Sequence, residues 1–296
     1  QLPNGLDYFV LANKEPKQRA EFRLVLKVGS LQEDDDQLGI AHFVEHMAFN
    51  GTRHFAKNDL IDFLERSGTR FGPDLNAYTS FDRTVYQLQV KTDSIKQLED
   101  GLLILEDWAS GLNFDPAEID KERGVVISEW RSRLSARQRF QQAYYPRLYR
   151  GARLATRLPI GEPALIDSIS YVRIKDFYSD WYRPDLMAII VVGDFEPEWM
   201  EKELVNRFSV LDNPAKARKK EKDGIVLEKR REDYIATDPD ESFATLTLYN
   251  KLPEWSYATT WEGLRRRIIL RFYNRMLNER YFELAQSPDC PFRFAS

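Results

Sequence analysis

The stretch His42-Phe-Val-Glu-His-Met-Ala-Phe-Asn-Gly-Thr52 contains the most informative spacing in the chain. Two histidines stand four positions apart, and Glu45 directly precedes the second. On an α-helix, residues at positions i, i+3 and i+4 lie on one face, so both imidazoles can reach one metal ion with the carboxylate beside them. The whole chain contains three histidines, so chance rarely produces this arrangement. We therefore predict a metal site on a helix.

The residues around these histidines predict a helix that enters the protein core. Apolar side chains recur at helical spacing through residues 38–49, and Asn50-Gly51 is typical of a helix end. A solvent-facing helix that carries His and Glu by coincidence fits poorly with so apolar a segment. Buried polar side chains need partners, and a metal ion would satisfy the imidazoles and the carboxylate together.

A catalytic zinc ion takes three protein ligands and keeps one position open for water. Two histidines leave one ligand to find, because Glu45 is expected to take a proton from zinc-bound water instead of binding the metal. His54 is one candidate, although it lies beyond the Asn50-Gly51 break. Glu122 and Glu129 are better candidates, since they stand seven positions apart and share one face of a predicted helix. One could bind zinc while the other orients a histidine, and spacing alone leaves the choice open.

Composition narrows the class of protein. The 296 residues include 43 Lys and Arg against 47 Asp and Glu, a net charge of −4, which excludes a nucleic-acid binder that works by bulk positive charge. No apolar run approaches the roughly 18 residues that span a bilayer, so no transmembrane segment is predicted. The single cysteine, Cys290, excludes an internal disulfide and is compatible with both a reducing and an exporting compartment.

The periodicity of apolar residues predicts an α+β fold, with a mostly antiparallel sheet packed with helices. The continuous apolar run at 186–193 predicts a central, buried strand. The other predicted strands lie at 7–12, 21–29, 69–79 and 84–91. The predicted helices lie at 38–49, 58–67, 94–111, 116–137 with a helical continuation to about 149, 163–183 and 196–208.

Composition changes after residue 211. Residues 212–223 are polar and charged, which indicates a solvated interdomain linker. Further strands are predicted at 225–228, 233–237 and 243–250, and a long helix at about 258–286. We expect residues 224–296 to be the truncated beginning of a second α+β domain, because they are too few for a complete one.

Several stretches together resemble one family of zinc peptidases. Residues 42–52 resemble the zinc helix of the M16 peptidases, the family of pitrilysin, insulin-degrading enzyme and the mitochondrial processing peptidase. The sequences Met-Ala-Phe-Asn-Gly-Thr and Asn-Ala-Tyr-Thr-Ser are similar to those of the bacterial PqqL-like group within this family. The resemblance is strong over residues 1–210 and weak beyond them. Its other matching stretches are Leu2–Leu6, Asn76–Ser80, Glu122–Glu129, Trp181–Met187 and Val191–Asp194.

The resemblance implies a site and a chemistry. It implies a zinc-dependent metalloendopeptidase that hydrolyses peptides or small unfolded proteins through a zinc-activated water, with Glu45 as general base. It also implies that an edge strand receives the substrate as an added strand, with contacts at Asn76 and Ala77. The residues it implies around one Zn²⁺ per chain are His42, His46 and Glu129 as ligands, and Glu122 as the residue that supports the site from behind.

The resemblance also implies partners and a location. Family members enclose substrate between two halves, so we expect residues 1–211 to be the N-terminal zinc-binding catalytic domain. The remaining C-terminal half of the same protein, or a partner subunit, would complete the chamber, and this chain alone is expected to cleave peptides poorly. The start at Gln1 and the PqqL-like resemblance favour the bacterial periplasm or cell envelope, with the cytoplasm as the alternative.

Two other classes of protein could carry a similar pattern. The family contains non-catalytic subunits and peptide-binding homologues, which usually lose one of the motif residues. The four residues His42, Glu45, His46 and Glu129 are all present, which favours an enzyme. A structural zinc module is the weaker alternative, because such sites usually have four closed ligands and favour cysteine.

Overall fold

The computed structural model describes residues 1–56, 59–60, 75–221, 223–227, 231–251 and 260–296. The chain divides into two compact units. The first comprises residues 1–226 and 232–244, and the second comprises residues 227–231 and 245–296. Apart from residues 59 and 60, the helix predicted at 58–67 lies outside the described residues, as does the first part of the strand predicted at 69–79.

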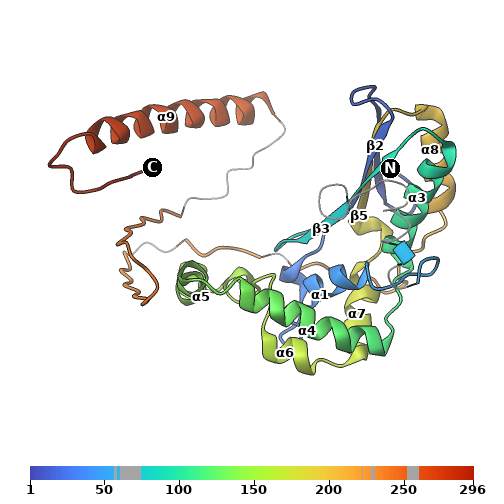
Figure 1. Ribbon diagram of the computed structural model, residues 1–296, viewed down its shortest axis with the longest axis horizontal. Helices are drawn as coiled ribbons and strands as arrows, with labels where there is room; N and C mark the ends of the chain where they lie inside the picture. Colours follow the sequence, from blue (N-terminus) through green and yellow to red (C-terminus); the bar gives the residue numbers. More distant parts are fainter. Residues whose placement is uncertain (57–58, 61–74, 222, 228–230, 252–259) are drawn as a thin grey trace. The chain divides into compact units, whose positions relative to one another are not determined.

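The first unit is built on a five-stranded sheet with the order β1-β5-β2-β4-β3 (Figure 1). The pairing of β1 with β5 is parallel, and the other three pairings are antiparallel, so the predicted α+β fold with a mostly antiparallel sheet is confirmed. The apolar strand β5 lies between β1 and β2, which confirms its central place. The strands are β1 Asp7–Ala12, β2 Arg19–Leu26, β3 Leu75–Thr79, β4 Thr84–Lys91 and β5 Met187–Gly193.

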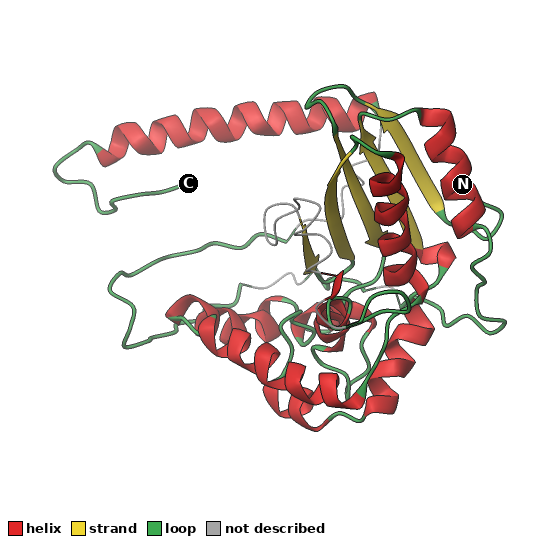
Figure 2. Ribbon diagram, turned by 45° about the vertical axis from the view of Figure 1, so that its right-hand side comes forward, coloured by secondary structure: helices red, strands yellow, loops and turns green. Residues whose placement is uncertain are grey.

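Buried side chains alternate with more exposed ones along the strands, because successive side chains point to opposite faces of the sheet. Phe22 and Leu24 are fully buried, whereas Arg23 between them is half-buried. Helix α3 (Ile95–Ser110) packs on β2 and β4, and helix α8 (Pro197–Phe208) packs on β1. Figure 2 shows both helices against the sheet.

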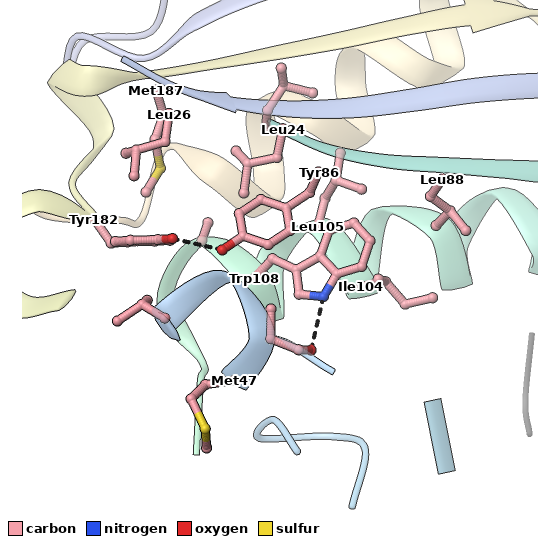
Figure 3. Packing of buried hydrophobic residues seen from close by; sticks show 14 of the residues in the cluster. Leu24, Leu26, Met47, Tyr86, Leu88, Ile104, Leu105, Trp108, Tyr182 and Met187 are labelled. Atoms are coloured by element: carbon pink, nitrogen blue, oxygen red, sulfur yellow. Dashed lines mark hydrogen bonds between the residues drawn. The ribbon is translucent and has the colours of Figure 1, made fainter. Parts of the chain in front are cut away.

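The core beneath the sheet contains polar atoms that are paired (Figure 3). Tyr86 of β4 stacks on Trp108 of α3 with ring centroids 5.2 Å apart. Tyr182 directly follows α7 (Tyr171–Trp181), and its hydroxyl lies 2.6 Å from the Tyr86 hydroxyl. The Trp108 Nε1–H donates to the Ala48 carbonyl at 3.2 Å. The core therefore fixes the C-terminal end of the histidine helix, which is α1 (Ile40–Met47).

The N-terminal end of α1 is fixed by a buried acid. The Glu33 carboxylate accepts hydrogen bonds from the backbone N–H of Gly39 at 3.1 Å and of Ala41 at 2.9 Å. Gly39 has φ of 99°, which favours glycine, and it provides no side-chain cap of its own. Burial raises the pKa of Glu33 to about 8, although the two backbone donors oppose this shift. Side chains from outside α1 therefore hold both of its ends.

Two predicted helices are each divided by a serine. The helix predicted from residue 116 ends at Ser132 as α4 (Pro116–Ser132), and α5 (Ala136–Leu148) begins after Ser135 accepts a hydrogen bond from the Gln138 N–H. The helix predicted at 163–183 is divided in the same way, because Ser170 caps the second part. A serine at this position satisfies a free N–H group of a new first turn. The parts are α6 (Pro163–Ser168) and α7.

The strands predicted at 225–228, 233–237 and 243–250 are wrong for the residues that the structure describes there, none of which is in a strand. A strand needs a neighbour for its backbone groups, and side chains of α5 hold part of this segment instead. Arg139 forms two hydrogen bonds to Asp238, and Arg147 lies 4.5 Å from the Tyr234 ring centroid.

The polar segment predicted as a solvated linker is exposed but makes specific contacts with the first unit. Arg218 pairs with Asp34 and Asp180. The Glu221 backbone exchanges hydrogen bonds with the Gln32 side chain at 3.0 and 3.3 Å. Part of the predicted linker therefore lies docked on the first unit, while the division of the chain into domains stays a prediction.

The second unit contains the long helix α9 (Trp261–Ala285), which confirms the helix predicted there. The Thr260 side chain caps it by accepting a hydrogen bond from the Gly263 N–H at 3.1 Å. No helix among the described residues combines the length and the apolar character needed to cross a membrane.

Candidate metal centre

Helices α1 and α4 lie side by side below the sheet, next to β3 (Figure 1). His42 and Glu45 on α1 are buried, with 7% and 6% of their surface exposed. The Nε2 atoms of His42 and His46 are 3.2 Å apart, and the two rings meet edge to face. The helical spacing thus brings the two imidazoles together at one point.

Glu129 on α4 completes a group of three possible ligands. Its Oε2 atom lies 3.3 Å from His46 Nε2 and 3.6 Å from His42 Nε2. Tetrahedral zinc with bonds of about 2.0–2.1 Å separates its ligand atoms by about 3.3 Å, so the three atoms fit such an ion. Among the described residues, these form one group of three whose ligand atoms lie within 4.8 Å of one another. Arg133 binds the other oxygen, Oε1, which leaves Oε2 facing the histidines.

Glu122 lies behind His46 and contacts its other nitrogen. The distance from Glu122 Oε1 to His46 Nδ1 is 2.7 Å. A carboxylate accepts hydrogen bonds, so this contact assigns a proton to Nδ1 and leaves Nε2 to face the cluster. Asn50 donates to the second oxygen of Glu122 at 2.7 Å. The geometry therefore gives the two glutamates different positions: Glu129 beside the Nε2 atoms of both histidines, and Glu122 against Nδ1 of His46.

The two histidines have very different pKa values when no metal is bound. Burial lowers the pKa of His42 to about 4, helped by the nearby His46. Partial burial of His46 would also lower its pKa, but its hydrogen bonds to Glu122 and Glu129 outweigh that effect and raise the pKa to about 9. The hydrogen bond to His46 in turn lowers the pKa of Glu129 to about 2. At neutral pH, His42 is therefore neutral and His46 is an imidazolium between two carboxylates.

Glu45 projects from the same helix and touches β3. The Thr79 hydroxyl donates to Glu45 Oε2 at 2.5 Å. Burial raises the pKa of Glu45 to about 7, although the hydrogen bond from Thr79 opposes the shift. A carboxyl group with a pKa near neutrality can accept and return a proton at that pH.

Strand β3 carries Asn76 and Ala77 at the edge of the described sheet. The Ser80 N–H points to the β4 side, where it donates to the Arg83 carbonyl at 2.8 Å. N–H groups alternate along a strand, so the N–H of Ala77 points away from β4. The Asn76 side chain accepts a hydrogen bond from it at 2.9 Å. This N–H group is thus directed to where an added strand would pair.

His54, the third candidate ligand from the sequence, lies outside this group. Its Nδ1 is 2.8 Å from Asp107 Oδ1, and its backbone N–H donates to the other oxygen of Asp107. The sequence did not predict three contacts of this site: Thr79 with Glu45, Arg133 with Glu129, and Asn50 with Glu122. The signal for Asn50 was available, because positions 42, 46 and 50 are four apart and continue one helical face.

The chain belongs to peptidase family M16. The family model described as insulinase, peptidase family M16, matches residues 8–159, and the model described as the peptidase M16 inactive domain matches residues 168–287.

The relatives include proteins named as zinc proteases. The probable zinc protease PqqL of Haemophilus influenzae is 45% identical over 72% of this chain and 23% of its own length. The probable zinc protease PqqL of Escherichia coli is 36% identical over 95% of this chain and 30% of its own length. The crystal structure of the first half of the periplasmic protease PqqL from Escherichia coli matches with a TM-score of 0.72 and 38% identity, over 77% of this chain and 48% of that one. The chain thus spans 23–30% of the length of these two curated relatives.

Because His46 is protonated and His42 is neutral at pH 7, we predict that binding of one zinc ion releases about one proton from His46. Apparent zinc affinity should rise about tenfold per pH unit and level off above the His46 pKa of about 9. Isothermal titration calorimetry in buffers of different ionisation enthalpy measures the release. Glu122→Gln is the matched control: it removes a carboxylate that raises the His46 pKa, so fewer protons should be released. No proton release from the unaltered chain at pH 7 would contradict this assignment.

Proposed function

We propose that this chain carries the zinc site of a metalloendopeptidase that hydrolyses peptides or small unfolded proteins. The main observation in favour is the convergence of His42 Nε2, His46 Nε2 and Glu129 Oε2 at separations of 3.2–3.6 Å. Zinc, when bound, polarises a carbonyl group and lowers the pKa of water. No serine or cysteine nucleophile is needed for this chemistry.

In this proposal, the ligands are held by neighbours that leave one side of the site open. The Arg133 guanidinium binds Glu129 Oε1, so Glu129 offers a single oxygen to the metal. Glu122 keeps a proton on His46 Nδ1, so His46 offers Nε2. Three ligand atoms leave a tetrahedral ion with one further position for water or substrate, as catalytic zinc sites require. The proposed stoichiometry is one zinc ion per chain.

Glu45 is the proposed general base. Its carboxylate lies one residue before a metal ligand, in a buried position where Thr79 holds one oxygen. It would take the proton from the attacking water and return it to the amine that leaves. Thr79 limits the rotation of the carboxylate, which keeps the other oxygen available for this transfer.

The substrate is proposed to add to β3 as a further strand. The Ala77 N–H, on the side of β3 that faces away from β4, would pair with a substrate carbonyl, and Asn76 would give up its present bond to that N–H. The peptide would then run past Glu45, because Thr79 on the same strand contacts it. Main-chain pairing of this kind favours extended and unfolded chains.

The rest of the enzyme is proposed to lie outside this chain. The remaining C-terminal half of a longer polypeptide, or a partner subunit, would close the substrate chamber, and the chain by itself would hydrolyse peptides poorly. The similar protein from Escherichia coli is described as periplasmic, and we propose the same compartment here, with the cytoplasm as the alternative.

If Glu45 is the general base, Glu45→Gln should retain zinc and lower hydrolysis by roughly 10²–10⁴-fold. Zinc content is measured on this chain by metal analysis. Peptide hydrolysis is measured on the complete enzyme that includes this chain. Glu99→Gln, at an exposed position on α3, is the matched control and should change neither. Loss of zinc from Glu45→Gln, or unchanged hydrolysis, would rule out this role.

The edge-strand proposal predicts that Ala77→Pro weakens peptide binding without affecting zinc. Proline is tolerated on an edge strand where the N–H faces outward, and it removes one main-chain bond worth roughly 0.5–1.5 kcal/mol. We expect binding of a fluorescent peptide to weaken by about two- to tenfold or more, measured by anisotropy in the Glu45→Gln background. Ala77→Ser keeps the N–H and should bind as before. Equal binding by all variants would argue against pairing at β3.

A further inference from the structure

Asn50 lies three residues after the end of α1 and bridges this helix to α4. Its Nδ2 amide donates to the His46 carbonyl at 3.2 Å and to Glu122 Oε2 at 2.7 Å. The two hydrogens of this amide thus reach the backbone of a proposed metal ligand and the carboxylate that contacts the ring of the same ligand. The bridge joins residues that are 72 positions apart in the chain.

Glu122 needs this second bond to stay in one orientation. The residue is buried, with 9% of its surface exposed, so few water molecules can serve its oxygens. Within the described residues, Oε1 is bonded to His46 and Oε2 to Asn50. A carboxylate with one donor on each oxygen cannot rotate about its terminal bond without losing both. Without Asn50, the terminal rotation would be restrained by the single contact with His46.

The orientation of Glu122 decides what His46 offers to a metal. Its bond to Nδ1 fixes both the tautomer and the plane of the imidazole. Asn50 also holds the His46 carbonyl, so backbone and ring are restrained by one amide. A loose Glu122 would let the ring of His46 turn, and Nε2 would leave its position near His42 Nε2.

We propose that Asn50 is a positioning residue of the zinc site, which acts through Glu122 to hold the Nε2 atom of His46 toward the metal. The inference rests on the proposed function, because it assumes that the metal is held by His46. The side-chain hydrogen bonds that the structure gives Asn50 go to the His46 carbonyl and to Glu122, so we class it as a positioning residue and not as a catalytic one.

Asn50→Ala and Asn50→Leu test the proposal through zinc affinity, measured by competition with a chromophoric chelator on this chain. Loss of a residue that orients a metal ligand from behind typically weakens metal binding by about 10–100-fold, and we expect this for both variants. Asn113→Ala, at an exposed asparagine, is the matched control and should bind zinc like the unaltered chain. Circular dichroism of each metal-free variant reports whether the fold is kept.

A double-mutant cycle separates positioning from a general structural role. If Asn50 acts through Glu122, then Asn50→Ala should cause little further loss of zinc affinity in a Glu122→Ala background, so the two effects are far from additive. A residue that only stabilised the fold would weaken binding equally in both backgrounds.

The outcomes distinguish this inference from the proposed function. If the unaltered chain binds zinc and Asn50→Ala and Asn50→Leu bind it equally well, the role of Asn50 is overturned and the zinc site stands. Additive losses in the cycle, or variants that unfold without metal, would also overturn the role. A chain that binds no zinc would overturn both.

Discussion

Burial of ionisable side chains on an apolar helix is the constraint on which the rest of this structure depends. His42 and Glu45 are almost fully enclosed, and isolated polar groups in such a place cost free energy unless they are paired. The chain provides a partner for most of these atoms: Glu122 for His46 Nδ1 and Thr79 for Glu45. The Nε2 atoms of both histidines and one oxygen of Glu129 face one another at 3.2–3.6 Å, and such a set of nitrogen and oxygen atoms is suited to a cation.

The surrounding fold keeps that set rigid. The sheet carries Thr79 on one strand and supports the aromatic core on another. Trp108 in that core donates a hydrogen bond to the carbonyl of Ala48, directly after the histidine helix α1. Glu33 holds the opposite end of the helix by its first N–H groups. Because α1 is short, it owes its position to these outside contacts and to packing more than to its own hydrogen bonds.

The sequence predicted those parts of the protein that follow from local periodicity. The alternation in β2, the apolar run of β5 and the i, i+4 histidines each correspond to one physical rule, and each lies where expected. The segments after residue 223 that were predicted as strands have strand-like local sequence. Strand pairing depends on distant neighbours, however, and arginines of α5 contact part of that segment instead. The choice between Glu122 and Glu129 also needed three dimensions, since two glutamates on one helical face differ only in what they meet. Their roles at a metal stay a proposal.

The central claim is that one zinc ion is held by two imidazoles and one carboxylate on α1 and α4. X-ray absorption at the zinc edge, on the chain loaded with one equivalent of zinc, tests it most directly. The account predicts two imidazole nitrogens at about 2.0–2.1 Å and oxygen ligands from a carboxylate and water at about 2.0–2.2 Å. A single imidazole, or a sulfur ligand at about 2.3 Å from the one cysteine, Cys290, would contradict it.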